Sequence, residues 1–378
     1  MARSRRRIST VVYRLFVLAA AAITGLIAAE LLLRLVNPSM SYGYMPQEIR
    51  ASYLRPSTFI LSELRPSNRS RFKMLEFDTT VITNSLGLRD NEVDFTKPRI
   101  LCLGDSFTFG YGVENDETFC ARLEELFGGQ YDFVNAGFAD GYAPSTYALW
   151  LTRYRERLSP SMILVNFFQN DSGDVRMDTW IKDGQVMGPE DTGLPDKSIR
   201  PGYIVTDDGV GMRDNWRAML PVPIRRWMKM SYVVAFLRSR VIRDLDSADT
   251  AQPERDVAAE AAAEAAIDAA EDRKFNRSLD LMQDAAGDTP LVFYVIGGLV
   301  GLEELAPSKV DRLVTAYART HDIPLLMNHR GFTTDDFFPQ DMHFKPSGHE
   351  KAAAYLFREL SRLGLRNQSG LDRSILIE

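Results

Sequence analysis

The chain has 378 residues, 45% of them hydrophobic and 25% charged, with two Cys and four His. These values are typical of a globular protein and exclude a collagen-like, disordered or disulfide-scaffold chain. The net charge of −6 gives no electrostatic basis for binding nucleic acid, which needs a basic surface. Cys102 and Cys120 are too few for a Cys-rich zinc site. Cys102 lies in an apolar run, so a buried free thiol is its simplest interpretation.

The N-terminal segment, residues 1–37, begins with four arginines within 1–10 and continues as an apolar stretch. Its uninterrupted core, 15–29, is about 22 Å long as a helix and falls short of a ~30 Å hydrocarbon layer, whereas 11–33 is long enough to cross one. A signal anchor, a cleaved signal peptide and a core helix are all open, and the lack of paired small residues at a cleavage site favours the anchor. The arginine bias then predicts a single-pass membrane protein with a cytoplasmic N-terminus and a periplasmic or extracellular main domain.

Short apolar runs alternate with helical patterns after a polar, proline-punctuated connector with strand-like pieces at 38–98. The runs predicted to be buried strands are 99–103, 131–134, 162–168, 291–296 and 323–327. The helical patterns include 119–127, 308–318 and 351–363, the last of them preceded by a Ser347–Glu350 capping box. This alternation predicts an α/β domain over 99–365 with about five mostly parallel strands, followed by a tail at 366–378.

A large insertion at 172–286 separates the third and fourth predicted strands. An Asp-Gly pair within 181–186 predicts a hairpin. Residues 224–243 mix apolar residues with arginines, and we expect them to form a helix that caps the domain, with contact to anionic lipid as the alternative. Residues 251–270 are rich in Ala and acidic residues, which predicts an exposed helix or spacer.

The residues that follow each strand are the first candidates for chemistry, because ligands bind beyond the carboxyl ends of the strands in such sheets. The first strand runs into Gly104-Asp105-Ser106, which places a serine at a strand-to-helix turn where its hydroxyl can project above the sheet. We expect Asp105 to support this turn rather than to react.

An Asp-His pair near the C-terminus supplies the partner that a serine nucleophile needs. Asp341 and His343 lie in the loop before the last predicted helix, again at the edge of the crevice. A carboxylate that fixes one imidazole nitrogen leaves the other to take the proton of a serine hydroxyl. His349 follows a glycine at a helix start and His321 lies at a helix end, so both are expected to be structural.

Two further strand ends carry candidate donors for the negative charge that develops on a carbonyl oxygen during acyl transfer. The second strand ends in the block 135–141, where a glycine lets a backbone N–H approach a ligand closely. We prefer Gly141 as this donor and keep Gly137 as the alternative. The third strand is followed by Asn170, whose side-chain amide is expected to point at the same place.

The sequence resembles the SGNH, or GDSL-type, hydrolases, a superfamily of esterases, lipases and enzymes acting on the acyl groups of carbohydrates. The matching motifs, in the family's order, are Gly-Asp-Ser-Phe-Thr-Phe-Gly at 104–110, Asn-Ala-Gly…Gly at 135–141, Asn-Asp at 170–171 and Asp-Met-His at 341–343. The resemblance implies a flavodoxin-like three-layer α/β/α domain in which Ser106 is the nucleophile, His343 the general base and Asp341 the carboxylate that orients it. It also implies an oxyanion hole made by the Ser106 N–H, a glycine of the second block and Asn170, and it implies no metal or cofactor.

Three features depart from the family pattern. One residue rather than two separates Asp341 from His343, a form also found in membrane-associated and polysaccharide-acetylating members. Phe168 stands where the third block usually begins with Gly, which is expected to narrow the pocket. The second block is one residue longer than usual before Gly141.

The resemblance predicts two-step acyl transfer, in which Ser106 attacks an ester carbonyl and the acyl-enzyme passes its acyl group to water. We expect an ester-bearing small molecule or an acylated glycan as the partner, and the compartment and family habit favour O-acetyl groups on cell-envelope or exported glycan. Two alternatives are open at this stage. One is an O-acyltransferase, in which a sugar hydroxyl replaces the water. The other is a catalytically inactive binding module on the same fold.

Overall fold

The chain divides into two compact units, and each is described by itself. The N-terminal unit contains Met1–Gln47 and Met219–Arg255, and the sheet unit contains Glu48–Ala218 and Asp256–Glu378. The computed structural model describes residues 2–36, 52–57, 59–60, 62–74, 76–139, 142–175, 180–182, 185–187, 203–206, 209–212, 231–234, 236–237, 257–297 and 307–365.

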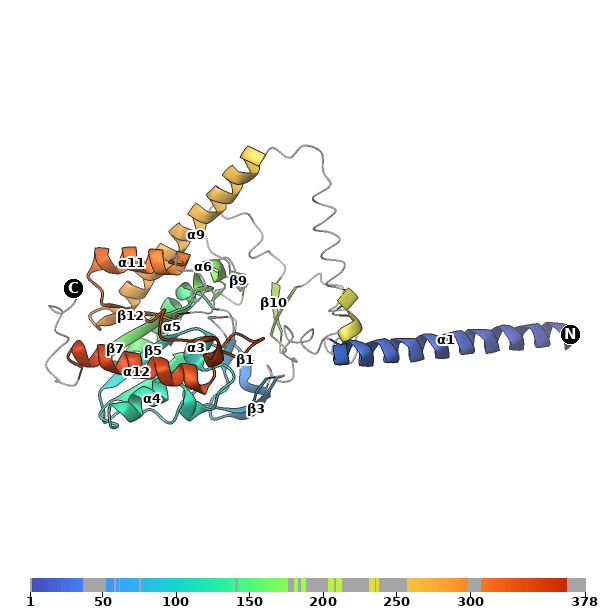
Figure 1. Ribbon diagram of the computed structural model, residues 1–378, viewed down its shortest axis with the longest axis horizontal. Coiled ribbons are helices and arrows are strands. Elements are labelled where there is room, and N and C mark those ends of the chain that lie inside the picture. The colour runs from blue at the N-terminus through green and yellow to red at the C-terminus, as the bar shows by residue number, and fades with distance from the viewer. Residues whose placement is uncertain are drawn as a thin grey trace. The chain divides into compact units, whose positions relative to one another are not determined.

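A five-stranded parallel sheet forms the centre of the sheet unit (Figure 1). In the order in which they lie side by side, its strands are β13 (Leu325–Met327), β12 (Leu291–Val295), β7 (Met162–Phe167), β5 (Arg99–Gly104) and β6 (Asp132–Gly137). Numbered along the chain, this order is 2-1-3-4-5 read from β6, which is the flavodoxin-like order. The predicted fold class is therefore confirmed, with strand ends displaced by up to three residues from the apolar runs.

Helices cover both faces of this sheet because its strands alternate apolar side chains between the two faces. The first face packs against α5 (Pro144–Leu158), α9 (Val257–Ala286) and α11 (Lys309–His321). The second face packs against α4 (Phe119–Leu126) and α12 (Pro346–Arg362). Together these helices and the sheet make a three-layer α/β/α sandwich.

The long segment between β7 and β12 contains the short helix α6 (Asp171–Asp174), two hairpins and α9. The strand pairs of the hairpins are β8 (Trp180–Lys182) with β9 (Gln185–Met187), as predicted for 181–186, and β10 (Tyr203–Thr206) with β11 (Gly209–Met212). Within 251–270, residues 265–269 are mostly exposed, as predicted, but Ala270 is buried. Further along α9, Phe275, Leu279 and Met282 are buried as well. The second half of α9 is therefore a layer helix, although the sequence pattern placed it in the insertion.

The predicted connector supplies two antiparallel hairpins to the sheet unit. They are β1 (Leu54–Pro56) with β2 (Ser62–Leu64) and β3 (Arg69–Lys73) with β4 (Asp78–Ile82). Behind them lies Arg89, which is 1% exposed and donates to the carbonyl oxygens of Phe109, Gly110 and Val113. A buried guanidinium needs such acceptors, so this residue ties the hairpin region to the turn that follows β5.

The N-terminal unit is built around α1 (Ala2–Val36). Within this helix, Phe16–Val36 has 21 residues with a mean hydropathy of 2.3 and is long and apolar enough to cross a membrane. That finding is compatible with a signal anchor or a membrane span. Only 231–234 and 236–237 of the predicted cap helix at 224–243 lie among the described residues, and they group with α1 rather than with the sheet unit.

Candidate active site

Ser106 lies at the carboxyl edge of the sheet, at the first position of the short helix α3 (Ser106–Phe109). Asp105 is the N-cap, and its Oδ1 accepts a hydrogen bond from the Phe107 N–H at 2.9 Å, which is the supporting role predicted for it. A Cβ added at Gly104 would lie 2.3 Å from Thr108 Oγ1 and 2.7 Å from the Asn166 carbonyl oxygen. The turn therefore needs glycine before the serine, because no side chain fits where β5 meets its neighbour.

His343 contacts Ser106 across 237 residues of sequence. Its Nε2 lies 2.7 Å from Ser106 Oγ, and its Nδ1 is hydrogen-bonded to Asp341 Oδ1. A carboxylate only accepts, so Nδ1 carries the proton and Nε2 is the acceptor for the serine hydroxyl. The structure thus brings together the three residues that the sequence motifs singled out, in the arrangement that a serine nucleophile requires.

The single residue between Asp341 and His343 has a left-handed backbone. Met342 has φ 70°, which a non-glycine residue rarely adopts. Its N–H donates to the Phe338 carbonyl at 2.9 Å, and the Phe338 N–H donates to the His343 carbonyl at 2.9 Å. This tight loop turns the chain sharply between the two side chains, which explains how a spacing of one residue still allows the Asp-His hydrogen bond.

Glu76, from the turn between β3 and β4, holds this loop from outside. Its carboxylate accepts hydrogen bonds from the backbone N–H groups of Gln340 and Asp341 at 3.0 and 2.9 Å. Glu76 was not predictable from the sequence because it acts on backbone amides, which leave no residue pattern, and because it lies in the segment interpreted as a connector.

Aromatic rings surround the imidazole of His343. Tyr111 is stacked on it, with ring centroids 4.6 Å apart and an interplanar angle of 26°, and Phe107 lies at 5.0 Å. Phe168 packs on Phe107 with centroids 4.0 Å apart. Phe168 therefore adds an aromatic ring beside the turn that carries Ser106.

The predicted oxyanion donors differ in how their N–H groups are used. The Ser106 N–H occupies the first turn of α3, where no intrahelical acceptor exists. The Gly137 N–H donates to Asn135 Oδ1 at 2.9 Å, so this alternative donor is already engaged. Asn170 Nδ2 donates to Asp174 Oδ2 at 2.6 Å, which fixes the amide and leaves its second N–H for a ligand. Gly141, the preferred glycine, lies outside the described residues.

A buried acidic network supports the turn after β7. Asp171 accepts hydrogen bonds from the Tyr147 hydroxyl at 2.9 Å and from the Phe168 N–H at 2.8 Å. Burial raises the pKa of Asp105 to about 6 and the pKa of Asp171 well above its usual range. The negative charge of Asp174 raises both pKa values further, and that of Asp105 also raises the pKa of Asp171. Through these contacts Asp105 and Asp171 hold the turns that follow β5 and β7.

Two of the remaining histidines have structural positions, as predicted. His349 is buried, its Nδ1 accepts from the Phe119 N–H at 3.2 Å, and burial lowers its pKa to about 3. His321 is the last residue of α11. The predicted capping box of the last helix is wrong, because α12 begins at Pro346 with Lys345 as its N-cap. Proline is favoured at the first helical position, so the helix starts before Ser347.

The two cysteines are free and buried, in agreement with the interpretation of Cys102 as a buried thiol. Among the described residues, no group of three or more His, Cys, Asp or Glu side chains could hold a metal ion.

No family model and no curated protein matches the sequence. Among solved structures, the chain is similar to a candidate lipolytic protein of the G-D-S-L family from Desulfitobacterium hafniense, at 9% identity over 69% of this chain and 99% of that chain, with a TM-score of 0.37. It is also similar to a carbohydrate esterase of family 3 from Talaromyces cellulolyticus (10% identity, 70% and 97% coverage, TM-score 0.34). A third similar structure is an acetyl xylan esterase from the rumen bacterium Butyrivibrio proteoclasticus, at 13% identity over 73% of this chain and 66% of that chain, with a TM-score of 0.34. These neighbours are esterases or lipolytic proteins by name, and at these scores the likeness assigns no activity to this chain.

Proposed function

We propose that this protein is a serine esterase that cleaves acyl esters through an acyl-enzyme on Ser106. The observation that carries the proposal is the continuous hydrogen-bonded series from Ser106 Oγ to His343 Nε2, at 2.7 Å, and from His343 Nδ1 to Asp341. A hydroxyl is a weak nucleophile unless a base takes its proton as it attacks, and this series places the base within hydrogen-bond distance.

In the proposed reaction, Ser106 Oγ attacks the ester carbonyl carbon while His343 Nε2 takes the hydroxyl proton. The tetrahedral intermediate collapses when Nε2 returns that proton to the leaving alkoxide, which departs as an alcohol. Water then attacks the acyl-enzyme with the same base, and the acid is released. Asp341 stabilises the imidazolium that forms in each half-reaction.

The negative charge on the carbonyl oxygen would be bound by the Ser106 N–H and the Asn170 amide, with Gly141 as the third donor. One such donor is worth about 3 kcal/mol in the transition state. The hydrogen bond from Asn170 to Asp174 supports this assignment because it fixes the direction of the amide before substrate binds.

We further propose that the acyl group is short, O-acetyl in the first place, and that the alcohol is a small molecule or a glycan. The ring of Phe168 against Phe107 supports a short acyl group, since it occupies space beside the nucleophile turn. The apolar helix Phe16–Val36 supports an extracytoplasmic, membrane-anchored location with a cytoplasmic N-terminus, where surface or exported glycans are within reach.

The decisive experiment compares wild type with Ser106→Ala in p-nitrophenyl acetate turnover, together with labelling by a fluorophosphonate probe. Loss of the nucleophile is expected to lower kcat by at least about ten-thousandfold and to abolish labelling. Ser361→Ala, which removes a hydroxyl bonded within α12, is the matched control and is expected to keep both. Equal turnover in Ser106→Ala and wild type refutes the proposal.

A further inference from the structure

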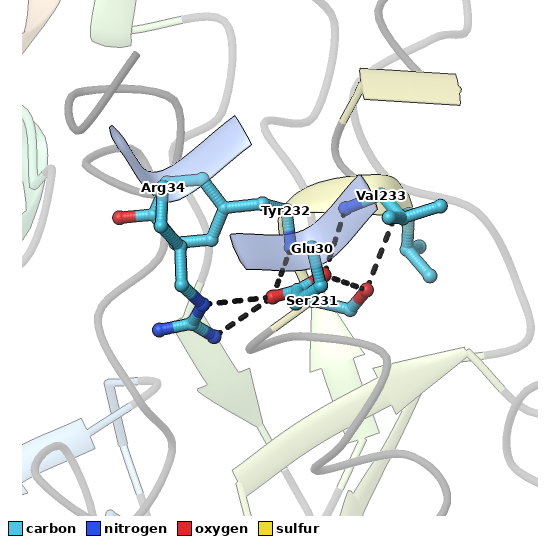
Figure 2. A network of polar contacts seen from close by, with 6 residues as sticks. Glu30, Arg34, Ser231, Tyr232 and Val233 are labelled. Carbon is cyan, nitrogen blue, oxygen red and sulfur yellow. Dashed lines mark hydrogen bonds and ion pairs between the residues drawn. The ribbon is translucent and has the colours of Figure 1, made fainter. Parts of the chain in front are cut away.

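Glu30 lies inside the apolar helix α1, and donors surround its carboxylate (Figure 2). Arg34, one turn further along α1, donates to Oε1 from Nε and Nη2 at 3.0 and 2.8 Å. The other donors are Ser231 Oγ at 2.8 Å, the Tyr232 N–H at 2.9 Å and the Val233 N–H at 3.0 Å. The Arg34 guanidinium also lies 4.6 Å from the centroid of the Tyr232 ring. The short helical segment that begins after Ser231 is therefore fastened to α1 within the N-terminal unit.

The position of this contact along α1 matches the edge of a bilayer. Glu30 lies six residues before Val36, the end of the apolar stretch, which corresponds to about 9 Å along the helix axis. Interfacial helices bury their apolar side about 5–10 Å into the boundary between headgroups and acyl chains. A carboxylate at that depth is costly unless it is paired and hydrogen-bonded, and the donors from Arg34 and from the second segment meet that requirement.

The sequence around the docked segment has the composition of a membrane-surface element. Between 224 and 243 there are six basic residues and no acidic residue, and the apolar run Ser-Tyr-Val-Val-Ala-Phe-Leu at 231–237 lies between them. Leu237 is 56% exposed, whereas Tyr232, five residues earlier in the same segment, is buried with its ring under Arg34 of α1. An exposed apolar side chain flanked by arginines fits a surface where apolar chains lie under anionic headgroups.

We infer that the segment around 231–237 is a second membrane-binding element. Its described residues, 231–234 and 236–237, lie in the interface beside α1, and the basic residues that flank them in the sequence bind anionic phospholipid headgroups. The inference rests on the proposed insertion of α1 and is independent of the proposed esterase activity. It replaces the predicted cap over the domain with the alternative that the sequence left open.

The test uses the full-length chain in lipid nanodiscs with an environment-sensitive NBD fluorophore on a single introduced cysteine. The native Cys102 and Cys120 are buried and are not expected to be labelled. One variant, Leu237→Cys, reports on the second element, and the other, Leu26→Cys, reports on α1, where Leu26 is 52% exposed. Discs of phosphatidylcholine alone are compared with discs containing equal parts of phosphatidylglycerol, each with and without brominated acyl chains as quenchers.

The inference predicts that brominated lipid quenches both probes, and that quenching at 237 is stronger in the anionic discs. Replacing Arg238, Arg240 and Arg243 by Gln is expected to lower the partition constant of the segment between lipid and water by about a hundredfold. Quenching should then be lost at 237 and kept at 26. The matched control neutralises three surface arginines of the sheet unit, Arg319, Arg358 and Arg362, and is expected to leave both probes unchanged.

The outcomes separate the two assumptions. An unquenched probe at 26 refutes the insertion of α1, and with it the basis of the inference. A quenched probe at 26 with an unquenched probe at 237 refutes the inference alone. If the probe at 237 ignores lipid but responds to a soluble anionic polysaccharide, the basic residues bind glycan, and the inference is likewise overturned.

Discussion

Removing the carboxylate of Glu76 tests whether the hairpin region positions the proposed Asp-His pair. Glu76 contacts neither Ser106 nor His343, and its partners are the N–H groups of Gln340 and Asp341. In Glu76→Ala those amides turn to water, and the loop loses the contact that holds Asp341 in place. We therefore expect activity to fall because the imidazole is less well oriented, although every proposed reacting group is present.

The size of the effect follows from the two contacts. A hydrogen bond to a charged group contributes about 1.5–3 kcal/mol when buried, and Glu76 is partly exposed, so water replaces much of each bond. We expect the two hydrogen bonds together to contribute about 1–2 kcal/mol to the stability of the transition state, so their loss should lower kcat by about 5–30-fold. Glu76→Gln retains one acceptor oxygen and should lie between wild type and the alanine variant.

The assay is p-nitrophenyl acetate turnover as a function of pH, with urea unfolding of each variant. Glu92→Ala is the matched control, because Glu92 also accepts from a backbone N–H and a side chain, those of Ser85, at a turn away from the site. Both variants should lose similar stability, but only Glu76→Ala should lower kcat with little change in KM. A wild-type kcat in Glu76→Ala would show that the loop needs no external support. An equal loss of kcat in Glu92→Ala would show that the effect is not specific to the Asp341 loop.

Three further predictions follow from single residues. Met342→Gly should change the free energy of unfolding by less than about 1 kcal/mol, because relief of the left-handed backbone offsets the added freedom of the unfolded chain. Met342→Val should lower the free energy of unfolding in urea by about 1–2 kcal/mol and reduce activity. Equal stability of the two variants would contradict this prediction. The pKa of His349 is lowered by burial from 6.5 to about 3, so the unfolded chain binds a proton that the native chain does not, and stability should fall as the pH drops from about 6.5 towards 3. His349→Gln should flatten that part of the urea-unfolding profile, and an unchanged slope would exclude this cause. Phe168→Ala should raise the ratio of p-nitrophenyl butyrate to acetate turnover about tenfold, because two methylenes gain space, and a constant ratio would place the acyl group elsewhere.

The sequence was sufficient for features that are local in the chain. The strand β5 and the turn at Ser106 were predictable because an apolar run, a glycine and a capping Asp105 follow one another directly. The start of α12 was mispredicted for an equally local reason, since Ser347 and Pro346 are both start signals and proline, with its fixed φ, prevailed. The contact between Ser106 and His343 joins residues 237 positions apart. It was predictable only because both residues lie at the expected crevice edge of the sheet and fall in motifs that resemble those of a known family.

The parts of the site that sequence reasoning missed act through the backbone. Glu76 accepts from two backbone amides, and Arg89 donates to three backbone carbonyl groups besides the Asn115 side chain, so most of their partners leave no residue pattern in the sequence. Tyr111 stacks on His343 only because the chain reverses after α3. Polar residues in a segment that shows no periodicity are indistinguishable from solvated connector residues until the fold supplies their partners.

Arg89 provides the strictest test of the view that the hairpin region is part of the fold rather than a connector. Its guanidinium is buried and stays charged at neutral pH, since burial lowers its pKa only to about 10. In Arg89→Met the buried carbonyl oxygens of Phe109 and Val113 lose their donor, whereas the Gly110 carbonyl keeps a hydrogen bond from the Val113 N–H at 3.3 Å. Each unsatisfied group costs about 1–3 kcal/mol, so the loss should exceed about 2 kcal/mol in urea unfolding.

The exposed Arg71, paired with Asp78 on the hairpin surface, is the matched control, and Arg71→Met should change stability by less than about 1 kcal/mol. If Arg89→Met unfolds like the control, then the carbonyl groups behind Ser106 find other donors and the hairpins are dispensable to the nucleophile turn. If it unfolds as predicted, residues 52–98 must fold with the sheet for Ser106 to be presented at all. In that case the region that looks least organised in the sequence is a condition for the proposed chemistry.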